Sequence, residues 1–246
     1  MHYIITDIHG CYAEYVELLD KIHLTDEDAL YILGDSCDRG PEPIKVLQDM
    51  LMRPNVIYIL GNHDYMMIVV LRKLLAAAEK SKVDWDQFFT DEDMFCYVDW
   101  INNGGMVTLQ QFLALSLEDQ QDILEFLEDA LIYDVIEDEG GRFILVHAGI
   151  DHFEERKSLE EYDFEDFIYA RPDYSRRYYS DRNIFVVTGH TPTQLIREDK
   201  QPLVYQEKGH IALDCGCVFG GNLAAFCVET GEVTYVKAKR WLPENG

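Results

Sequence analysis

The sequence contains a long segment without a single basic residue. Between Lys82 and Arg142 there is no Lys or Arg, whereas sixteen Asp and Glu residues lie within residues 84–139. The whole chain carries 21 Lys and Arg against 46 Asp and Glu, which gives a formal net charge of −25. A solvated acidic helical surface explains this segment more simply than a dedicated docking surface does. In either case the segment repels a long polyanion, so we expect no nucleic-acid partner.

Long apolar runs are also missing. The longest stretch, residues 66–78, is too short to cross a bilayer and contains Arg72 and Lys73. The N-terminus has no basic segment followed by an apolar one, and a strand pattern begins almost at once. We therefore expect a cytoplasmic protein with no membrane partner.

Linkers, repeats and a second cysteine pair are absent as well. Because no Pro/Gly/Ser-rich linker divides the 246 residues, we expect one domain, 1–246, with a helical cap inserted at about residues 85–130. Six cysteines without a secretory signal fit reduced thiols better than disulfides. Cys215-Gly216-Cys217 has no partner pair at the spacing of a zinc site, so we expect these two cysteines in the core.

The sequence does contain five short polar strings, and each follows an apolar, β-branched run. The runs at residues 3–5, 30–33, 56–60, 143–146 and 184–187 are typical of buried strands. The strings are Asp7-Ile8-His9-Gly10, Gly34-Asp35-Ser36-Cys37-Asp38-Arg39-Gly40, Gly61-Asn62-His63-Asp64, His147-Ala148-Gly149 and Gly189-His190-Thr191-Pro192. Because the carboxyl ends of strands in an open α/β sheet share one rim, we expect these strings to converge on one site.

The elements between the strings predict an α/β fold. Amphipathic patterns at residues 13–22, 41–52 and 65–80 each follow a strand, so strand, loop and helix alternate three times. Residues 85–130 are predicted to be helical and to cap the rim, with Ser116-Leu117-Glu118-Asp119 as a helix start. Beyond residue 131 the pattern is mainly β. Residues 203–213 and 223–238 indicate paired strands.

The order D-x-H-G, G-D-x-x-D-R-G, G-N-H-[DE], H-x-G and G-H resembles the PPP superfamily of calcineurin-like metallophosphoesterases. That superfamily includes serine/threonine protein phosphatases and symmetrical dinucleoside tetraphosphatases. A string such as Gly-Asn-His-acid arises by chance about once in 10⁵ positions. The resemblance spans the chain from Asp7 to about Val236, although between residues 84 and 140 it is carried by little beyond residues 100–105. It implies a two-sheet β-sandwich flanked by helices, and attack on phosphorus by a hydroxide that bridges two metal ions.

Two sets of metal ligands are expected. Asp7 and His9 are two residues apart at a strand end, so both side chains point to the same side and can hold one ion. Asp35 ends the second strand and can bridge two ions with its two oxygens. The ligands expected for the second ion are Asn62, His147 and His190. Mixed oxygen and nitrogen donors suit Mn²⁺, and Fe or Zn²⁺ remain open.

The resemblance also implies the catalytic and phosphate-binding residues. His63 resembles the general acid that protonates the leaving group, and Asp38 resembles the carboxylate that orients it. Arg39 is expected to bind the phosphate through its planar fork. Arg171 resembles the family's second phosphate-binding arginine, although the family usually has Trp at the Tyr169 position, and a surface arginine is the alternative. His210 is expected to approach the metals without being a ligand.

The leading functional interpretation is a metal-dependent serine/threonine protein phosphatase that acts on a phosphoprotein or a phosphorylated small molecule. Two departures weaken it, because Asp64 and Ala148 stand where eukaryotic-type protein phosphatases carry Glu and usually Gly, although the resemblance to bacterial members allows both variants. The alternative is a symmetrical dinucleoside tetraphosphatase, which needs an additional basic surface and a platform for a base. The candidates for these are Arg176, Arg177 and Arg182 with Tyr174, Tyr178 and Tyr179, which equally fit an exposed loop.

A third interpretation is a binding scaffold with this fold that has lost catalysis. Loss of catalysis should show first at His63, Asp35 or Arg39, and all three are present. The physiological substrate, the native metal and the oligomeric state are left open by the sequence.

Overall fold

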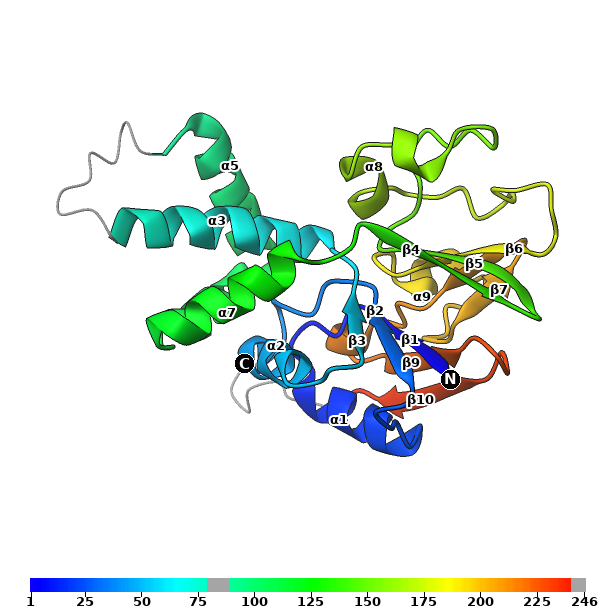
Figure 1. The fold of residues 1–246 in the computed structure, drawn as a ribbon, viewed down its shortest axis with the longest axis horizontal. Helices are drawn as coiled ribbons and strands as arrows, with labels where there is room; N and C mark the ends of the chain where they lie inside the picture. The colour runs from blue at the N-terminus through cyan, green and yellow to red at the C-terminus, as the bar shows by residue number, and fades with distance from the viewer. Residues whose placement is uncertain (79–88, 240–246) are drawn as a thin grey trace.

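The computed structural model describes residues 1–78 and 89–239, and these form two mixed five-stranded sheets with helices on the outside (Figure 1). The first sheet has the order β10-β9-β1-β2-β3 and the second has the order β4-β5-β6-β8-β7. The strands of the first sheet are β1 (His2–Ile5), β2 (Ala29–Ile32), β3 (Val56–Tyr58), β9 (Asn222–Cys227) and β10 (Val233–Lys237). Those of the second are β4 (Tyr133–Asp138), β5 (Gly141–Val146), β6 (Ile184–Thr188), β7 (Tyr205–Glu207) and β8 (His210–Ala212). The predicted α/β sandwich is confirmed.

Within each sheet, three neighbouring strands are parallel. Strands β1, β2 and β3 run parallel in the first sheet, and β5, β6 and β8 run parallel in the second. The C-terminal pairs are antiparallel, as the sequence predicts: β7 with β8, and β9 with β10. The strands that precede the five polar strings therefore belong to two sheets rather than to the single rim expected from the alternating pattern.

Side-chain alternation along the strands builds the layers. In β1, Ile4 packs in the cluster between the sheets, and its neighbour Ile5 packs under the helices on the outer face. In β5, Leu145 faces the inter-sheet cluster while Ile144 faces the outer side of the second sheet. Both sheets are thus buried on two sides, which holds their strand ends in fixed positions.

Helices follow the first three strands, as expected. They are α1 (Tyr12–Lys21), α2 (Pro43–Leu51) and α3 (Asn62–Ala78). Helix α1 buries Tyr15, Leu18 and Leu19, which have the spacing of one helical face, and α2 has Pro43 in its first turn. Two short helices, α8 (Glu165–Ile168) and α9 (Thr193–Ile196), lie in the C-terminal half.

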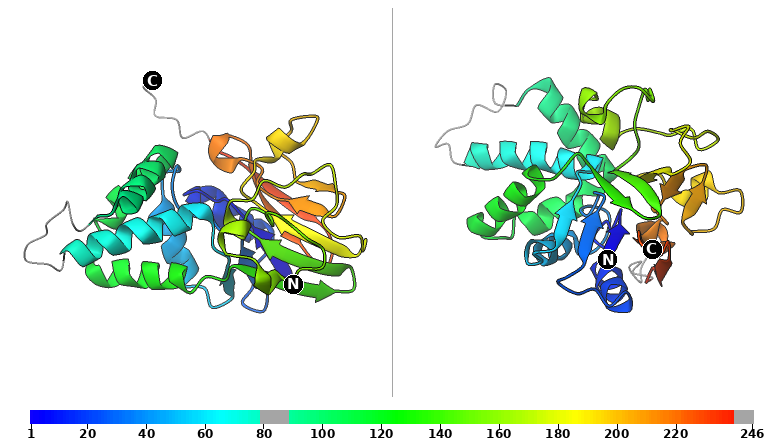
Figure 2. Two further views of the ribbon diagram at one scale, coloured as in Figure 1. Left: turned by 90° about the horizontal axis from the view of Figure 1, so that it is seen from above. Right: turned by 45° about the vertical axis from the view of Figure 1, so that its right-hand side comes forward.

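Residues 91–128 of the acidic segment form a helical group beside the first sheet. It contains α5 (Asp91–Trp100), an irregular turn (Ile101–Gly105), α6 (Met106–Phe112) and α7 (Leu117–Glu128). Ser116 is the N-cap of α7, as predicted, since its side chain accepts from the Asp119 amide. Predicted helical residues 85–88 lie outside the described residues. The views in Figure 2 show this group extending to one side of the two sheets.

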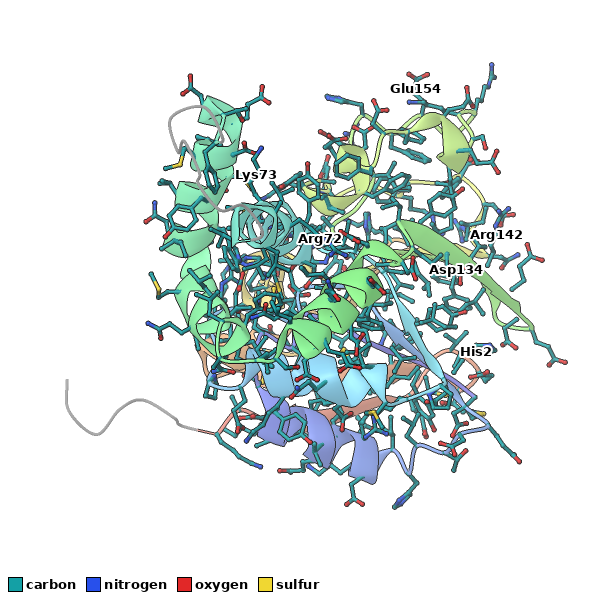
Figure 3. All side chains as sticks on the ribbon, turned by 60° about the vertical axis from the view of Figure 1, so that its left-hand side comes forward. His2, Arg72, Lys73, Asp134, Arg142 and Glu154 are labelled. Carbon is teal, nitrogen blue, oxygen red and sulfur yellow. The ribbon has the colours of Figure 1, made fainter. Side chains whose placement is uncertain are left out.

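Ion pairs tie this helical group to α3. Arg72 of α3, labelled in Figure 3, donates two hydrogen bonds of 2.6 Å to Glu128 at the end of α7. The neighbouring Lys73 lies 2.8 Å from Asp93 of α5.

The description of the whole chain as one domain with this segment inserted stays a prediction. In the part of the chain that the structure describes, no helix is long and apolar enough to cross a membrane.

All six cysteines are free thiols, and Cys215 and Cys217 are buried, as expected for core residues.

Candidate active site

The loops that leave the strands carry the site residues in an unusual backbone conformation. Six of the ten predicted site residues have positive φ, although only ten residues other than glycine do so in the described ranges. The six are Asp7, His9, Asp35, Asp38, Arg39 and His190. A left-handed backbone is costly for residues with a β-carbon and persists only when the surroundings impose it. The concentration of this strain at one place marks a functional site.

Two glycines permit the close approach of the carboxylates. A β-carbon on Gly61 would lie 2.2 Å from an Asp35 oxygen, and one on Gly189 would lie 2.1 Å from an Asp7 oxygen. These distances are far below van der Waals contact. Glycine is therefore required at both positions by the packing of the site.

Asp35 lies between two groups of histidines. Its Oδ2 is 3.7 Å from His9 Nε2 and 4.0 Å from His63 Nε2, whereas its Oδ1 is 3.5 Å from His147 Nε2. Each oxygen thus faces a different group. This arrangement fits the predicted bridging role of Asp35.

The second group contains all three ligands expected for one ion. Asn62 Oδ1 lies 3.1 Å from His147 Nε2 and 2.9 Å from His190 Nδ1. His147 donates from Nδ1 to the Leu33 carbonyl at 2.7 Å, which leaves its Nε2 lone pair directed at the site. Nitrogen atoms of His147 and His190 and an oxygen of Asp35 all lie within 4.8 Å of one another.

The first group contains Asp7 and His9. His9 donates from Nδ1 to the Cys37 carbonyl at 2.8 Å, so its Nε2 is also left for a ligand bond. Asp7 Oδ2 accepts from the Thr6 hydroxyl and from the His190 amide, at 2.5 and 2.9 Å. These bonds orient the carboxylate. No described residue donates a hydrogen bond to its other oxygen, Oδ1.

The electrostatics of the site call for cations. Burial, together with the charges of Asp214 and Asp35, holds the pKa of Asp7 well above its usual range. Burial and the Arg39 charge hold the pKa of His9 well below its usual range, and burial with His147 lowers that of His190 to about 3. Crowded buried carboxylates and neutral imidazoles are the donors that divalent ions require. The residues present therefore fit a pair of ions, whose identity the donor set leaves open among Mn²⁺, Fe and Zn²⁺.

His63 differs from these histidines. Burial by itself would lower its pKa, but the charge of Asp35 and the hydrogen bond to Asp38 outweigh burial and raise the pKa. Its Nδ1 donates to Asp38 Oδ2 at 2.6 Å, so Nε2 faces the site. Neighbouring groups whose environments push their pKa values apart are typical of acid and base assignments. The geometry therefore favours the predicted proton-donor role of His63.

Arg39 contacts two histidines on the same side of Asp35. Its Nη1 lies 2.5 Å from His9 Nε2 and its Nη2 lies 2.7 Å from His63 Nε2. Its backbone amide and Nε donate to the carbonyls of Gly104 and Asn103, at 3.1 and 3.2 Å. The irregular turn after α5 therefore holds the arginine whose planar fork is expected to bind phosphate.

Arg171 lies on the C-terminal side of the site. Its Nη1 donates to the Thr191 hydroxyl at 3.1 Å, one residue after His190. It also lines a cavity of about 700 Å³ that is bordered by Ile150, three residues after His147. Arg176, Arg177, Tyr178 and His210 line the same cavity.

The members of the basic cluster differ in their surroundings, and so does His210 from the metal-binding histidines. Arg177 donates to the carbonyls of Tyr179, Asp181 and Ile184, so it supports the loop. Arg182 is exposed and does not line the cavity. His210 donates from Nε2 to the Arg176 carbonyl at 2.6 Å and belongs to the cavity wall rather than to the metal-binding groups.

Three further residues hold the site but have no role in the sequence-based interpretation. Trp100 Nε1 donates to Asp38 Oδ2 at 2.8 Å, and the Thr108 hydroxyl donates to Asp38 Oδ1 at 2.6 Å. Asp64 Oδ2 accepts from the amides of Asp35 and Gly61, at 2.8 and 3.0 Å. Asp64 and Trp100 lie in sequence strings on which the family resemblance rests, and that resemblance was the only indication of these two residues in the sequence. Thr108 has no such signal.

The site geometry agrees with a comparison against known families. The sequence model of the calcineurin-like phosphoesterases matches residues 3–236. The chain belongs to this family. It is accordingly a metal-dependent phosphoesterase, and the two groups around Asp35 lie where a dimetal centre of this family would be bound.

Several similar proteins are named as nucleosyl tetraphosphatases. An asymmetrical bis(5'-nucleosyl)-tetraphosphatase PrpE from Geobacillus sp. (strain WCH70) is 29% identical over 91% of this chain and 88% of its own length. A symmetrical bis(5'-nucleosyl)-tetraphosphatase from Buchnera aphidicola subsp. Schizaphis graminum is 37% identical, but over 44% of this chain and 40% of its own length. The crystal structure of a proposed diadenosine tetraphosphatase shares the fold, with a TM-score of 0.65 and 20% identity over 97% of this chain and 94% of that chain.

Proposed function

We propose that the chain hydrolyses bis(5'-nucleosyl) tetraphosphates. This substrate class is that of the alternative interpretation of the sequence, and it replaces the phosphoprotein substrate of the leading interpretation. The observation that carries this proposal is the cavity of about 700 Å³ that begins at Arg171. A single phosphoryl group on a side chain does not need such a volume, whereas a nucleoside with part of a polyphosphate chain does. The relative that aligns over nine-tenths of both chains carries this activity in its name.

The charges along the cavity support a phosphate chain. Arg171 and Arg176 line it, and two of the acids on its wall are engaged locally. Asp173 accepts from Ser175 and from Arg176, at 2.5 and 2.8 Å, and Glu155 accepts from the Ser180 hydroxyl at 2.6 Å. The cavity wall also carries Phe153 and Tyr178, whose rings pack edge to face at 4.9 Å. Arginine and aromatic groups are the contacts that recognise phosphates and bases.

The reaction requires little covalent chemistry from the protein. When bound, the metal pair supplies an activated water and neutralises charge on the phosphoryl group. Arg39 and Arg171 bind the phosphoryl oxygens and orient the group for in-line attack. The water oxygen bonds to phosphorus, the bridging P–O bond breaks, and His63 gives its Nε2 proton to the departing phosphate. Asp38 keeps His63 aligned through the 2.6 Å bond to Nδ1.

The test is a comparison of substrates with the metal-loaded protein. Diadenosine tetraphosphate, phosphoserine and phosphothreonine peptides, and p-nitrophenyl phosphate are assayed side by side with Mn²⁺. We expect kcat/KM for the dinucleotide to exceed that for any phosphopeptide by at least about tenfold, a difference of 1.4 kcal/mol in transition-state binding. Chromatography of the products shows which bond breaks, since central cleavage gives two ADP and outer cleavage gives ATP and AMP. A phosphopeptide preference would instead restore the protein-phosphatase assignment.

A further inference from the structure

We propose that Phe219 is the stacking platform for a nucleobase of the substrate, a specificity determinant that rests on the proposed function. Phe219 is 65% exposed. The guanidinium carbon of Arg39 lies 5.5 Å from the centre of this ring. Since Arg39 also contacts His9 and His63, the exposed ring lies next to the group expected to bind the phosphate.

The backbone presents this ring from a firmly held turn. Phe219 ends a short 3₁₀ turn (Cys217–Phe219) that is flanked by Gly216 and Gly220, both in the left-handed conformation. The amides of Phe219 and Gly221 donate to the Gly216 carbonyl at 3.0 and 2.9 Å. Cys217 at the start of the turn is buried in the core. The ring is thus preorganised, which lowers the entropic cost of stacking a ligand on it.

Exposure alone would not support this inference, because isolated exposed apolar residues are common on protein surfaces. Phe95 of α5 is 75% exposed and lies outside the site groups and the Arg171 cavity. What distinguishes Phe219 is the contact with Arg39. A nucleotide whose phosphate is held by Arg39 has its base within reach of a flat aromatic face, and stacking on such a face tolerates any base.

The contact with Arg39 also suggests a competing explanation. A cationic guanidinium is attracted to an aromatic face, so the ring could act only by holding Arg39 in place. A ring that only positions Arg39 should affect every phosphate substrate equally. A ring that stacks the base should affect substrates with bases more than substrates without them.

The experiment measures this difference. Wild type, Phe219→Ala, Phe219→Trp and Phe95→Ala are assayed on diadenosine tetraphosphate and on inorganic tetraphosphate, which has no base. Phe219→Ala should lower the ratio of the two kcat/KM values about tenfold, mainly through KM for the dinucleotide. Phe219→Trp should restore the ratio, and Phe95→Ala should leave it unchanged. Equal losses on both substrates in Phe219→Ala would overturn the inference in favour of Arg39 positioning.

A binding measurement separates the platform from the proposed function. ADP and pyrophosphate are titrated into the Mn²⁺-loaded protein by calorimetry, and their affinity ratio should fall in Phe219→Ala by a similar factor. If wild type fails to hydrolyse the dinucleotide but binds ADP in a Phe219-dependent manner, the proposed function is wrong and the base platform is right. If the ADP to pyrophosphate ratio is unaffected by Phe219→Ala, the platform is wrong whatever the enzyme hydrolyses.

Discussion

The two sheets contribute to the site in different ways. One half of the site is formed by the segments after β2 and β3, which supply Asp35, Asp38 and His63, all almost completely buried. The other half of the site is formed by the segments after β5 and β6, and it leads to the exposed Arg171 and to a cavity of about 700 Å³. The first half is closed by the helical group, whereas the second is open toward solvent. We infer that the first half supplies the bridging carboxylate and the proton donor, whereas the open region around Arg171 recognises the substrate, so substitutions at these two places should affect kcat and KM respectively.

The largest effect is expected at Asp35, where the two halves meet. Asp35→Asn removes the carboxylate that faces both groups of histidines, so metal content and turnover should both fall to background. Elemental analysis and turnover with added Mn²⁺ measure the two quantities, and Asp199→Asn, an exposed surface ion-pair residue, should retain both. Chelation of wild type should abolish activity and Mn²⁺ should restore it. Full activity in metal-free Asp35→Asn protein would rule out the two-metal mechanism.

The next effect is expected at His63 in the buried half. His63→Asn should keep the metals but lose roughly 10²–10⁴ in kcat on alkyl phosphates, the usual contribution of a general acid. The loss should be smaller for p-nitrophenyl phosphate, because nitrophenolate leaves without a proton. His23→Asn is the matched control, since His23 is exposed and also has a left-handed backbone. Equal losses for good and poor leaving groups would contradict proton donation.

A smaller effect of the same kind is expected at Asp38, and it should appear in the pH profile. The hydrogen bond and charge of Asp38 raise the pKa of His63, so His63 stays protonated to higher pH. Asp38→Asn removes the charge and lowers this pKa. The alkaline limb of kcat should therefore move to lower pH when activity is measured with an alkyl phosphate. An unchanged or upward-shifted limb would show that another group controls it.

The helical group should matter through a single buried hydroxyl. Thr108 accepts from the Asp38 amide at 2.9 Å and donates to its carboxylate at 2.6 Å. Thr108→Val removes the Thr108 partner of the Asp38 amide and of Oδ1, which should lower the free energy of unfolding by about 1–3 kcal/mol and reduce kcat. Urea unfolding and kinetics measure the two effects. Thr108→Ser keeps the hydroxyl and should restore kcat; if it does not, the methyl packing is responsible.

Part of the fold and of the site could be predicted from the sequence, and part could not. The strand ends that carry Asp7, Asp35 and Asn62 were predictable, because apolar periodicity and polar strings are local features of the chain. The distribution over two sheets was not predictable from those features, since β9 joins β1 and β8 joins β6 through pairings remote in sequence. Only the family resemblance supplied the second sheet.

The supporting contacts were hidden for the same reason. Thr108 and Asp38 are 70 residues apart, and nothing in the local sequence of either indicates the contact. The basic cluster illustrates the same limit. Charge alone groups Arg176, Arg177 and Arg182, but backbone carbonyls, which no sequence pattern displays, engage Arg177. Sequence therefore predicts which chemical groups are present more reliably than which partners they find.

The smallest effect is expected in the open half, at Arg176. This residue is 79% exposed, and its Nε is 2.8 Å from Asp173 Oδ2. Arg176→Ala should raise KM for diadenosine tetraphosphate about two- to fivefold, because an exposed charge contact contributes under about 1 kcal/mol. The increase should shrink as salt is raised, because added salt shortens the distance over which charges interact, which is about 8 Å at physiological ionic strength. Replacing all three arginines would confuse the result, because loss of Arg177 disturbs the loop itself. Arg182→Ala removes the same charge from outside the cavity and is the matched control. Equal KM changes in the two variants would mean that net charge, rather than the cavity, sets substrate affinity, and the division between a chemical half and a recognition half would fail.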